Sequence, residues 1–141
     1  MRNIEKQRLK IQKLHQRIAN IRTDHTNKVI SEIVRTKPTY VTIGDLSVKD
    51  MSRSRIFSKA VTSQQFYSFR EKLQFKCYEN GIELRIADRG FPYSRRCSCC
   101  GAVNKNSTAG DKLFRCSCGN MAERALNASI NLKGAEKYTV A

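Results

Sequence analysis

Cys97-Ser-Cys-Cys-Gly101 and, after a polar loop, Cys116-Ser-Cys-Gly119 are the stretches that decide how this chain folds. A Cys-x-x-Cys turn can present two thiolates to one metal ion, and the glycine that closes it permits the backbone conformation such a turn often needs. The second pair of thiols can complete a four-thiolate site on the same ion. The spacing predicts a structural zinc ribbon whose Zn²⁺ ligands are Cys97, Cys100, Cys116 and Cys118.

The two remaining cysteines are predicted to have other roles. Cys99 lies inside the first turn, and we interpret it as a bystander because Cys99-Cys100 does not form a Cys-x-x-Cys turn. Cys77 lies on an apolar helical stripe, which predicts a small core residue. The alternatives for the cluster are structural thiols without metal and a redox sensor. Because the chain opens on a polar, charged run instead of a secretion signal, metal ligands are favoured over disulfides.

The chain is strongly basic as a whole. Its 141 residues hold 27 Lys and Arg against 12 Asp and Glu, which gives a formal charge of +15. Most of the excess lies in residues 1–37 and 91–122. The excess indicates a polyanionic partner, and nucleic acid is favoured over a membrane surface. No apolar run has the length of a membrane span. The alternative is a basic surface that only keeps the protein soluble.

Specific basic side chains are the candidate contacts to nucleic acid. They lie on the first predicted helix, in the predicted loop at 47–60 and beside the cysteines. The set is Lys10, Lys13, Arg17, Arg53, Arg55, Arg95, Arg96 and Arg115. Such contacts would be made mostly to phosphate and would therefore weaken with added salt. For the first helix, a solvated basic face is an equal alternative.

Hydrophobic periodicity predicts an α/β fold around the cysteine module. Helical spacing of apolar residues predicts helices at 3–22, 26–36, 62–79 and 123–134. Residues 40–43 and 83–88 are predicted to be strands, the first of them buried, that pair in parallel across the intervening helix. Two strands make a poor sheet in isolation, so the predicted sheet is incomplete.

Several motifs resemble the C-terminal part of TnpB, the OrfB-type, transposon-encoded RNA-guided nuclease related to type V CRISPR effectors. Tyr40-Val-Thr-Ile-Gly-Asp-Leu-Ser-Val-Lys-Asp-Met51 is similar to the family's I-x-I-E-D-L-N-V-K-x-M. Pro92-Tyr-Ser-Arg-Arg-Cys-Ser-Cys-Cys-Gly101 is similar to P-S-S-K-x-C-S-x-C-G. Phe114-Arg-Cys-Ser-Cys-Gly119 and Leu126-Asn-Ala-Ser-Ile-Asn-Leu132 are similar to its F-x-C-x-C-G and L-N-A-S-I-N-L. In this order the motifs cover nearly the whole chain.

The resemblance implies an architecture and partners. The fold would be a partial RNase H-like (RuvC) α/β fold with an inserted zinc ribbon. A RuvC-like segment would occupy residues 1–90, the ribbon 91–122, and a C-terminal helix and tail 123–141. Guide RNA and DNA would be the partners, since base pairing with the guide selects the target. The family's first strands would precede residue 1, so the resemblance also implies an exposed apolar sheet edge that a partner chain or self-association would complete. A cytoplasmic, nucleoid-associated protein of a prokaryote is expected, with no membrane role.

The departures from the family concern its catalytic carboxylates. Three carboxylates hold two divalent metals in that family. The second-motif glutamate is expected where Gly44 stands, and the third-motif aspartate where Ala125 stands. The first-motif aspartate belongs to strands that would precede residue 1. Asp45 on its strand and Glu123 on its helix would point away from the two vacated positions. The departures predict a chain that is not an enzyme and binds no catalytic Mg²⁺.

The favoured function is a nuclease-dead, TnpB-derived nucleic-acid-binding subunit of an RNA-guided DNA-binding complex, with a partner chain that completes the fold. One alternative is a subunit of a split RNA-guided nuclease whose partner supplies catalysis. Another is a structural or regulatory zinc-ribbon protein without direct contact to nucleic acid. The last is a relic without function. Salt-dependent binding and cleavage assays separate the first three.

Overall fold

The computed structural model describes residues 2–47, 65–108 and 110–141 of the chain. They form two compact units, one from residues 2–38 and 65–80 and the other from residues 39–47 and 81–141. In chain order the elements are α1 (Arg2–Arg35), β1 (Tyr40–Gly44), α4 (Phe66–Glu79), β2 (Glu83–Ala87), β3 (Leu113–Arg115), β4 (Met121–Glu123), α5 (Arg124–Lys133) and β5 (Tyr138–Val140). The predicted mixed α/β class is confirmed. The predicted loop at 47–60 lies, after Ser47, outside the described residues.

The first unit begins with α1, a single helix of 34 residues. The sequence predicted two helices here, at 3–22 and 26–36, and the predicted break between them is wrong. No glycine or proline occurs before Pro38, and Lys28 pairs with Asp24 at 2.7 Å one turn away. The helix ends at Arg35, shortly before Pro38, because a proline disfavours helical backbone in the residue that precedes it.

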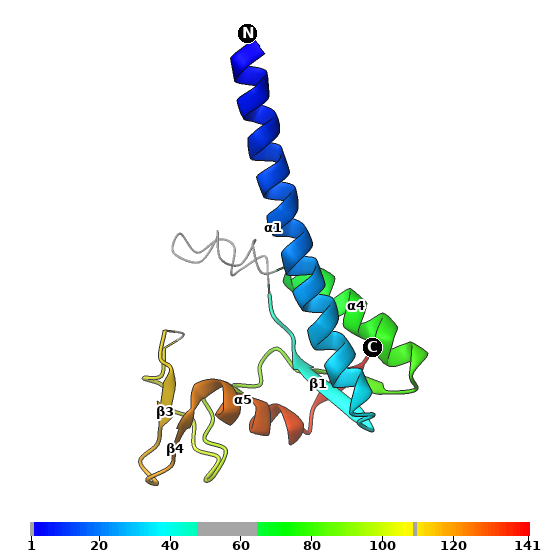
Figure 1. The fold of residues 1–141 in the computed structure, drawn as a ribbon. Helices are drawn as coiled ribbons and strands as arrows, with labels where there is room; N and C mark the ends of the chain where they lie inside the picture. The colour runs from blue at the N-terminus through cyan, green and yellow to red at the C-terminus, as the bar shows by residue number, and fades with distance from the viewer. Residues whose placement is uncertain (1, 48–64, 109) are drawn as a thin grey trace. The chain divides into compact units, whose positions relative to one another are not determined.

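The second helix of this unit, α4, contacts the C-terminal part of α1 (Figure 1). Ile30 of α1 is buried, and Lys72 of α4 donates a hydrogen bond to the Asn27 side chain at 3.0 Å. The buried residues of α4 are Leu73 and Cys77. The prediction that Cys77 is a core residue is therefore confirmed. Burial also raises the pKa of the Cys77 thiol, which keeps it protonated.

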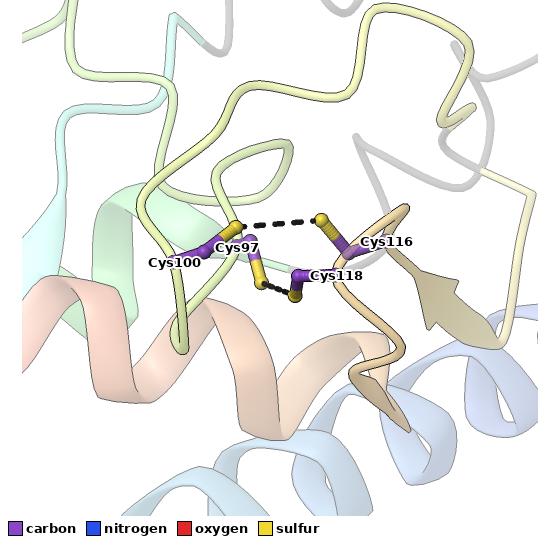
Figure 2. Close-up of side chains that lie close together, drawn as sticks. All are labelled: Cys97, Cys100, Cys116 and Cys118. Atoms are coloured by element: carbon purple, nitrogen blue, oxygen red, sulfur yellow. Dashed lines mark hydrogen bonds between the residues drawn. The ribbon is translucent and has the colours of Figure 1, made fainter.

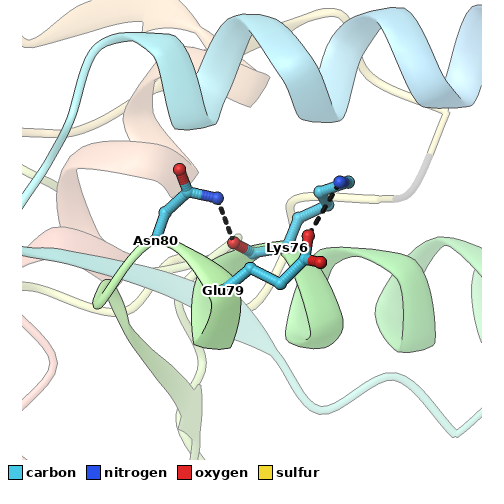
Figure 3. Close-up of polar contacts among 3 residues, drawn as sticks. All are labelled: Lys76, Glu79 and Asn80. Atoms are coloured by element: carbon cyan, nitrogen blue, oxygen red, sulfur yellow. Dashed lines mark hydrogen bonds and ion pairs between the residues drawn. The ribbon is translucent and has the colours of Figure 1, made fainter.

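Asn80 closes the C-terminal end of α4 (Figure 3). Its side-chain amide donates to the Lys76 carbonyl at 2.8 Å, and its backbone N–H donates to the Cys77 carbonyl at 3.1 Å. The Lys76 ammonium in turn pairs with the Glu79 carboxylate at 2.8 Å. Gly81 follows with a φ of 65°, a conformation that glycine adopts without strain. The Asn-Gly pair therefore ends the helix and leads into β2.

The second unit contains a three-stranded sheet in the order β1-β2-β5. β1 and β2 are parallel, with Gly44 opposite Ala87, as the sequence predicted. β1 is half-buried along its whole length, so the prediction of a buried strand is wrong for it, while β2 buries Leu84 and Ile86. β5, which pairs antiparallel with β2, was not predicted.

One side chain connects the three strands of this sheet. The Arg85 guanidinium of β2 lies 3.8 Å from the ring centre of Tyr40 on β1 and 4.5 Å from that of Tyr138 on β5. Cation–π contacts of this kind are favourable and hold both outer strands to the middle one. α5 packs beside β1, where the Tyr40 hydroxyl reaches the Lys133 carbonyl at 3.4 Å.

Candidate metal centre

The four predicted ligand cysteines converge in the second unit (Figure 2). Their sulfur atoms all lie within 4.8 Å of one another. The Cys97 and Cys118 sulfurs are 3.8 Å apart, and the Cys100 and Cys116 sulfurs are 3.6 Å apart. Four sulfurs at the usual Zn–S distance of about 2.3 Å, arranged as a tetrahedron, are about 3.8 Å from each other. The cluster therefore has the donor set and the spacing to hold one metal ion.

Two tight turns present the sulfur pairs. In the first turn the Gly101 N–H donates to the Cys97 carbonyl at 2.9 Å, and Gly101 has a φ of 77°. In the second, the Gly119 N–H donates to the Cys116 carbonyl at 3.1 Å, and Gly119 has a φ of 88°. Both glycines thus occupy left-handed positions that other residues rarely adopt. The second turn joins the antiparallel strands β3 and β4.

Two buried asparagines of α5 hold the first turn in place. The Asn127 carbonyl oxygen accepts the Ser98 backbone N–H at 2.9 Å, and its amide donates to the Arg96 carbonyl at 2.7 Å. The Asn131 amide donates to the carbonyls of Tyr93 and Arg96, at 2.9 and 2.7 Å. Asn127 is 0% exposed, so the loss of either hydrogen bond would leave a buried polar group without a partner.

Asn120 connects the two turns directly. Its side-chain amide donates to the Cys97 sulfur at 3.4 Å, and its backbone carbonyl accepts the Cys116 N–H at 3.0 Å. Sequence reasoning missed the roles of all three asparagines. For Asn127 and Asn131 a signal was present, because residues four apart on a helix share one face.

The environments of the four thiols differ. Burial by itself would raise the pKa of Cys97, but N–H donors from the Cys100 backbone, the Asn120 side chain and the Cys99 backbone outweigh it and lower the pKa to about 6. The Asn120 N–H favours the Cys118 thiolate, yet the neighbouring Cys100 and Cys116 sulfurs raise its pKa to about 12. Cys97 is thus the thiol most ready to bind a cation at neutral pH.

Cys99 is outside the group of four. It is exposed and forms no disulfide, and its sulfur is not among those that converge. This geometry agrees with the interpretation of Cys99 as a bystander. It also makes Cys99 a matched control for the four ligand cysteines, since it lies in the same turn.

The predicted nucleic-acid contacts fall into separate groups. Arg95, Arg96 and Arg115 are exposed and lie next to the cysteines. Asn104 links two of them through their backbones, since its N–H donates to the Arg95 carbonyl at 2.8 Å and its amide to the Arg115 carbonyl at 2.9 Å. Lys10, Lys13 and Arg17 are exposed on α1 in the first unit, and Arg53 and Arg55 lie outside the described residues.

Gly44 ends β1 beside Tyr93. A Cβ atom added at Gly44 would lie 2.5 Å from the Tyr93 hydroxyl oxygen, far inside van der Waals contact. Burial is the main cause that raises the pKa of the Tyr93 hydroxyl. The charge of Arg124 opposes this shift and the charge of Asp45 adds to it, so the hydroxyl stays neutral. Tyr93 therefore fills the space that a side chain at position 44 would need. Ala125, the other predicted vacated position, is exposed on α5.

Carboxylates line a cavity of about 610 Å³ beside β2 and β5. Asp45, Asp88 and Glu136 contribute to its wall. Asp45 also forms an ion pair with Arg89 at 2.9 Å. Among the described residues, however, only the four cysteines form a group of three or more His, Cys, Asp or Glu side chains close enough to share one ion.

Two family models match successive segments of the chain. The model described as "Probable transposase" matches residues 1–55, and the model described as "Cas12f1-like, TNB domain" matches residues 66–132. A cryo-EM structure of a Cas12f1–sgRNA–target DNA complex superimposes with a TM-score of 0.63 at 19% identity, covering 84% of this chain and 34% of that chain. This likeness shows a shared fold.

Sequence relatives extend over most of the chain. A Streptomyces pristinaespiralis protein named as an RNA-guided DNA endonuclease is 32% identical, covering 94% of this chain and 33% of that protein. An Escherichia coli (strain K12) protein with the same kind of name, InsQ, is 30% identical over 92% of this chain and 35% of its own length. The endodeoxyribonuclease Cas12f1 of Sulfoacidibacillus thermotolerans is 30% identical over 86% and 29%. The predicted family resemblance is confirmed, and the chain spans about a third of the length of these relatives.

The prediction that the chain is not an enzyme is wrong. Its relatives are named as endonucleases, and they match it along most of its length. That prediction rested on Gly44, on Ala125 and on a first-motif aspartate expected before residue 1, whereas the chain spans only about a third of each relative. The expectation that no catalytic Mg²⁺ is needed loses its basis with it. In the described part of the chain, none of the helices combines the length and apolarity needed to cross a membrane.

Proposed function

The chain is similar along most of its length to TnpB-type RNA-guided DNA endonucleases and their Cas12f1 relatives, and from this premise we propose that it forms the sheet and zinc-ribbon part of such an endonuclease. The observation that carries the proposal is the convergence of four cysteine sulfurs within the segment that the Cas12f1-like family model matches. The basic composition alone fits many classes of nucleic-acid-binding protein. Four converging cysteines within this matched segment favour the RNA-guided endonucleases among them.

Zinc is the metal we propose for the four-cysteine site, held by Cys97, Cys100, Cys116 and Cys118. A closed four-thiolate zinc site is structural, because it leaves no position open for substrate. Its binding free energy then contributes to folding of the turns and of the β3–β4 hairpin. We further propose that residues 91–122 form a ribbon inserted into an RNase H-like sheet. The parallel β1–β2 pair, joined by way of α4, supports this arrangement.

Guide RNA and target DNA are the proposed ligands, and the neighbouring Cas12f1 structure is titled as a complex with both kinds of molecule. On this chain, Arg95 and Arg115 are exposed arginines. Asn104 holds their backbones near each other, because it donates hydrogen bonds to both backbone carbonyls. Guanidinium groups bind phosphate in a bidentate manner. Arg96, Lys13 on α1, and residues Arg53 and Arg55 are further proposed contacts.

DNA cleavage is proposed for the assembled endonuclease. Among the described residues, no group of carboxylates comes close enough to share one metal ion, and we propose that a partner polypeptide supplies the catalytic carboxylates. The strand β1 is an edge of the sheet among the described residues, and an added strand could pair with it. Cleavage of this type uses divalent metals that stabilise the attacking and leaving oxygens.

The test is to purify the tagged chain from its native cells with everything bound to it. Sequencing of the bound RNA should give one enriched species, and the complex should cleave DNA that carries a matching target when Mg²⁺ is present. A Cys118→Ser variant should lose bound RNA and cleavage, whereas Cys99→Ser should keep both. Bound RNA without any enriched species, together with intact matching target, would contradict the proposed function.

A further inference from the structure

The N-terminal part of α1 carries a stripe of large apolar side chains exposed to solvent. Ile4, Leu14 and Ile21 are 68%, 59% and 60% exposed, and Ile11 and Ile18 belong to the same stripe. We call these five residues the α1 stripe. A row of isoleucine and leucine on one face of a helix normally faces an apolar neighbour. None of the residues that the structure describes covers this row.

The contact of α1 with α4 does not use this stripe. α4 packs against the C-terminal part of α1, where Ile30 is 2% exposed and lines a cavity with Lys72 and Phe75 (Figure 1). At 100° per residue, Ile30 lies about 120° round the helix from Ile18. The two helix faces are therefore distinct, and the stripe is left over after the first unit has folded.

The spacing of the stripe indicates what kind of surface it meets. Ile4, Ile11 and Ile18 repeat every seven residues, and so do Leu14 and Ile21 between them. Alternating steps of three and four residues keep the row straight only if the helix winds around another helix. Phosphate and sugar offer nothing to pack against such a row. The repeat favours a partner helix over nucleic acid as the occupant of the stripe.

The residues on either side of the α1 stripe indicate which charge a partner helix would carry. On a heptad repeat that begins at Ile4, the flanking positions hold four basic residues, namely Arg8, Lys10, Arg17 and Arg22, with His15 and Asp24. In a parallel pair of identical helices, Arg17 of one copy would face Arg22 of the other. Like charges at these positions oppose pairing, and opposite charges select a partner. A second copy of the chain is therefore disfavoured.

We propose that the α1 stripe docks an amphipathic helix of a partner polypeptide, one with an apolar stripe of the same repeat and acidic flanks. Ile11 and Ile18 form the centre of the contact, and Lys10 and Arg17 pair with the acidic flanks. Lys13 lies away from the stripe and stays available for other contacts. The site thus distinguishes partners by two independent features, one apolar and one electrostatic.

The experiment titrates the zinc-loaded chain of 141 residues with two labelled synthetic helices of about four heptads each. Both have isoleucine and leucine at the core positions, and they differ only in having glutamate or lysine at the flanks. Fluorescence anisotropy should show the glutamate helix binding about tenfold or more tightly than the lysine helix. Replacing Ile11 and Ile18 together by glutamine should weaken binding about tenfold or more.

Matched variants separate packing from charge. Leu9→Gln removes an apolar side chain that is also exposed, at 55%, but lies on the opposite face, and it should leave binding within about twofold. Lys10→Glu with Arg17→Glu should reverse the preference between the two helices, whereas Lys13→Glu should not. Circular dichroism of each variant checks that helix content is unchanged, so a loss of binding reports on the docked surface.

Three outcomes would overturn the proposal. One is equal binding of the two synthetic helices. Another is a dimer of the chain that Ile11→Gln and Ile18→Gln dissolve, which would make a second copy the occupant. The last is a loss of duplex DNA binding in the stripe variant as large as the loss of helix binding. Because the titration contains no nucleic acid, its failure leaves the proposed endonuclease function untouched.

Discussion

At the scale of the residue, single side-chain amides hold the candidate metal site together. Four cysteines supply the sulfurs, but the turn that carries Cys97 is fixed from outside by Asn127, Asn131 and Asn120. A buried amide that donates and accepts at once has no simple replacement, since any substitution leaves a backbone group without a partner. The cysteines define the site, and the asparagines position it.

Asn127→Ala should lower the free energy of unfolding by about 2 kcal/mol, because the Ser98 N–H loses its acceptor in a buried position. Urea unfolding of the zinc-loaded chain measures the change. Ser129→Ala is the control on the same helix, since the Ser129 hydroxyl bonds only locally to the Leu126 carbonyl. It should change stability by less than about 0.5 kcal/mol. Equal effects of the two variants would count against a bracing role for Asn127.

Zinc affinity should rise with pH. The pKa of Cys97 is lowered to about 6, so this thiol is already ionised at neutral pH, while the pKa of Cys118 is raised to about 12 and its proton must leave when the metal binds. Lower pH therefore opposes binding, most strongly once Cys97 is protonated as well. Competition with a chromophoric chelator between about pH 6 and pH 8.5 tests the trend. An affinity that is constant over this range would contradict it.

Secondary-structure elements could be predicted from the sequence where local signals were strong. The β-branched run before Gly44 has a local physical cause, and the strand predicted there is present. The spacing of the four cysteines is a local signal as well, and their sulfurs lie close together in the structure. β5 could not be found in this way, because its three residues become a strand only by pairing with β2. The contact between Tyr93 and Gly44 depends equally on tertiary structure, since it joins residues 49 positions apart.

Gly44→Ala should test how tightly Tyr93 closes the end of β1. The new methyl group would lie 2.5 Å from the Tyr93 hydroxyl oxygen, so overpacking should lower the free energy of unfolding by about 1–3 kcal/mol. In a Tyr93→Ala background the same substitution should cost clearly less, which a double-mutant cycle measures. Gly110→Ala, which meets nothing within 4 Å, is the control and should be nearly neutral. Additive effects at positions 44 and 93 would rule out the contact.

The molecule as a whole combines two folded units with a large positive charge. The formal charge of +15 could be predicted to favour a polyanion, but not which of the two units binds it. The exposed arginines beside the cysteines belong to the second unit, and the α1 stripe belongs to the first. We therefore expect nucleic-acid contact and helix docking to be separable by mutation.

Binding of duplex DNA should weaken strongly with salt. If about four phosphates are contacted, affinity should fall about 100-fold between about 50 mM and about 200 mM salt. Replacing Arg95 and Arg115 together by alanine should reduce the slope of log K against log salt by about 2, whereas Lys133→Ala, at the far end of α5, should not change it. Filter binding over a salt series measures the slopes. A slope near zero for the unmodified chain would exclude phosphate contacts as the source of affinity.

The measurement that tests the central claim most directly is the zinc content of the purified chain and of two variants. Elemental analysis should find one zinc ion per unmodified chain and per Cys99→Ser chain, since Cys99 lies outside the group of four. Cys118→Ser should lose the metal or hold it far more weakly, and its β3–β4 hairpin should lose protection from hydrogen exchange. Zinc retained equally in all three proteins, or absent from the unmodified chain, would contradict a four-cysteine zinc ribbon.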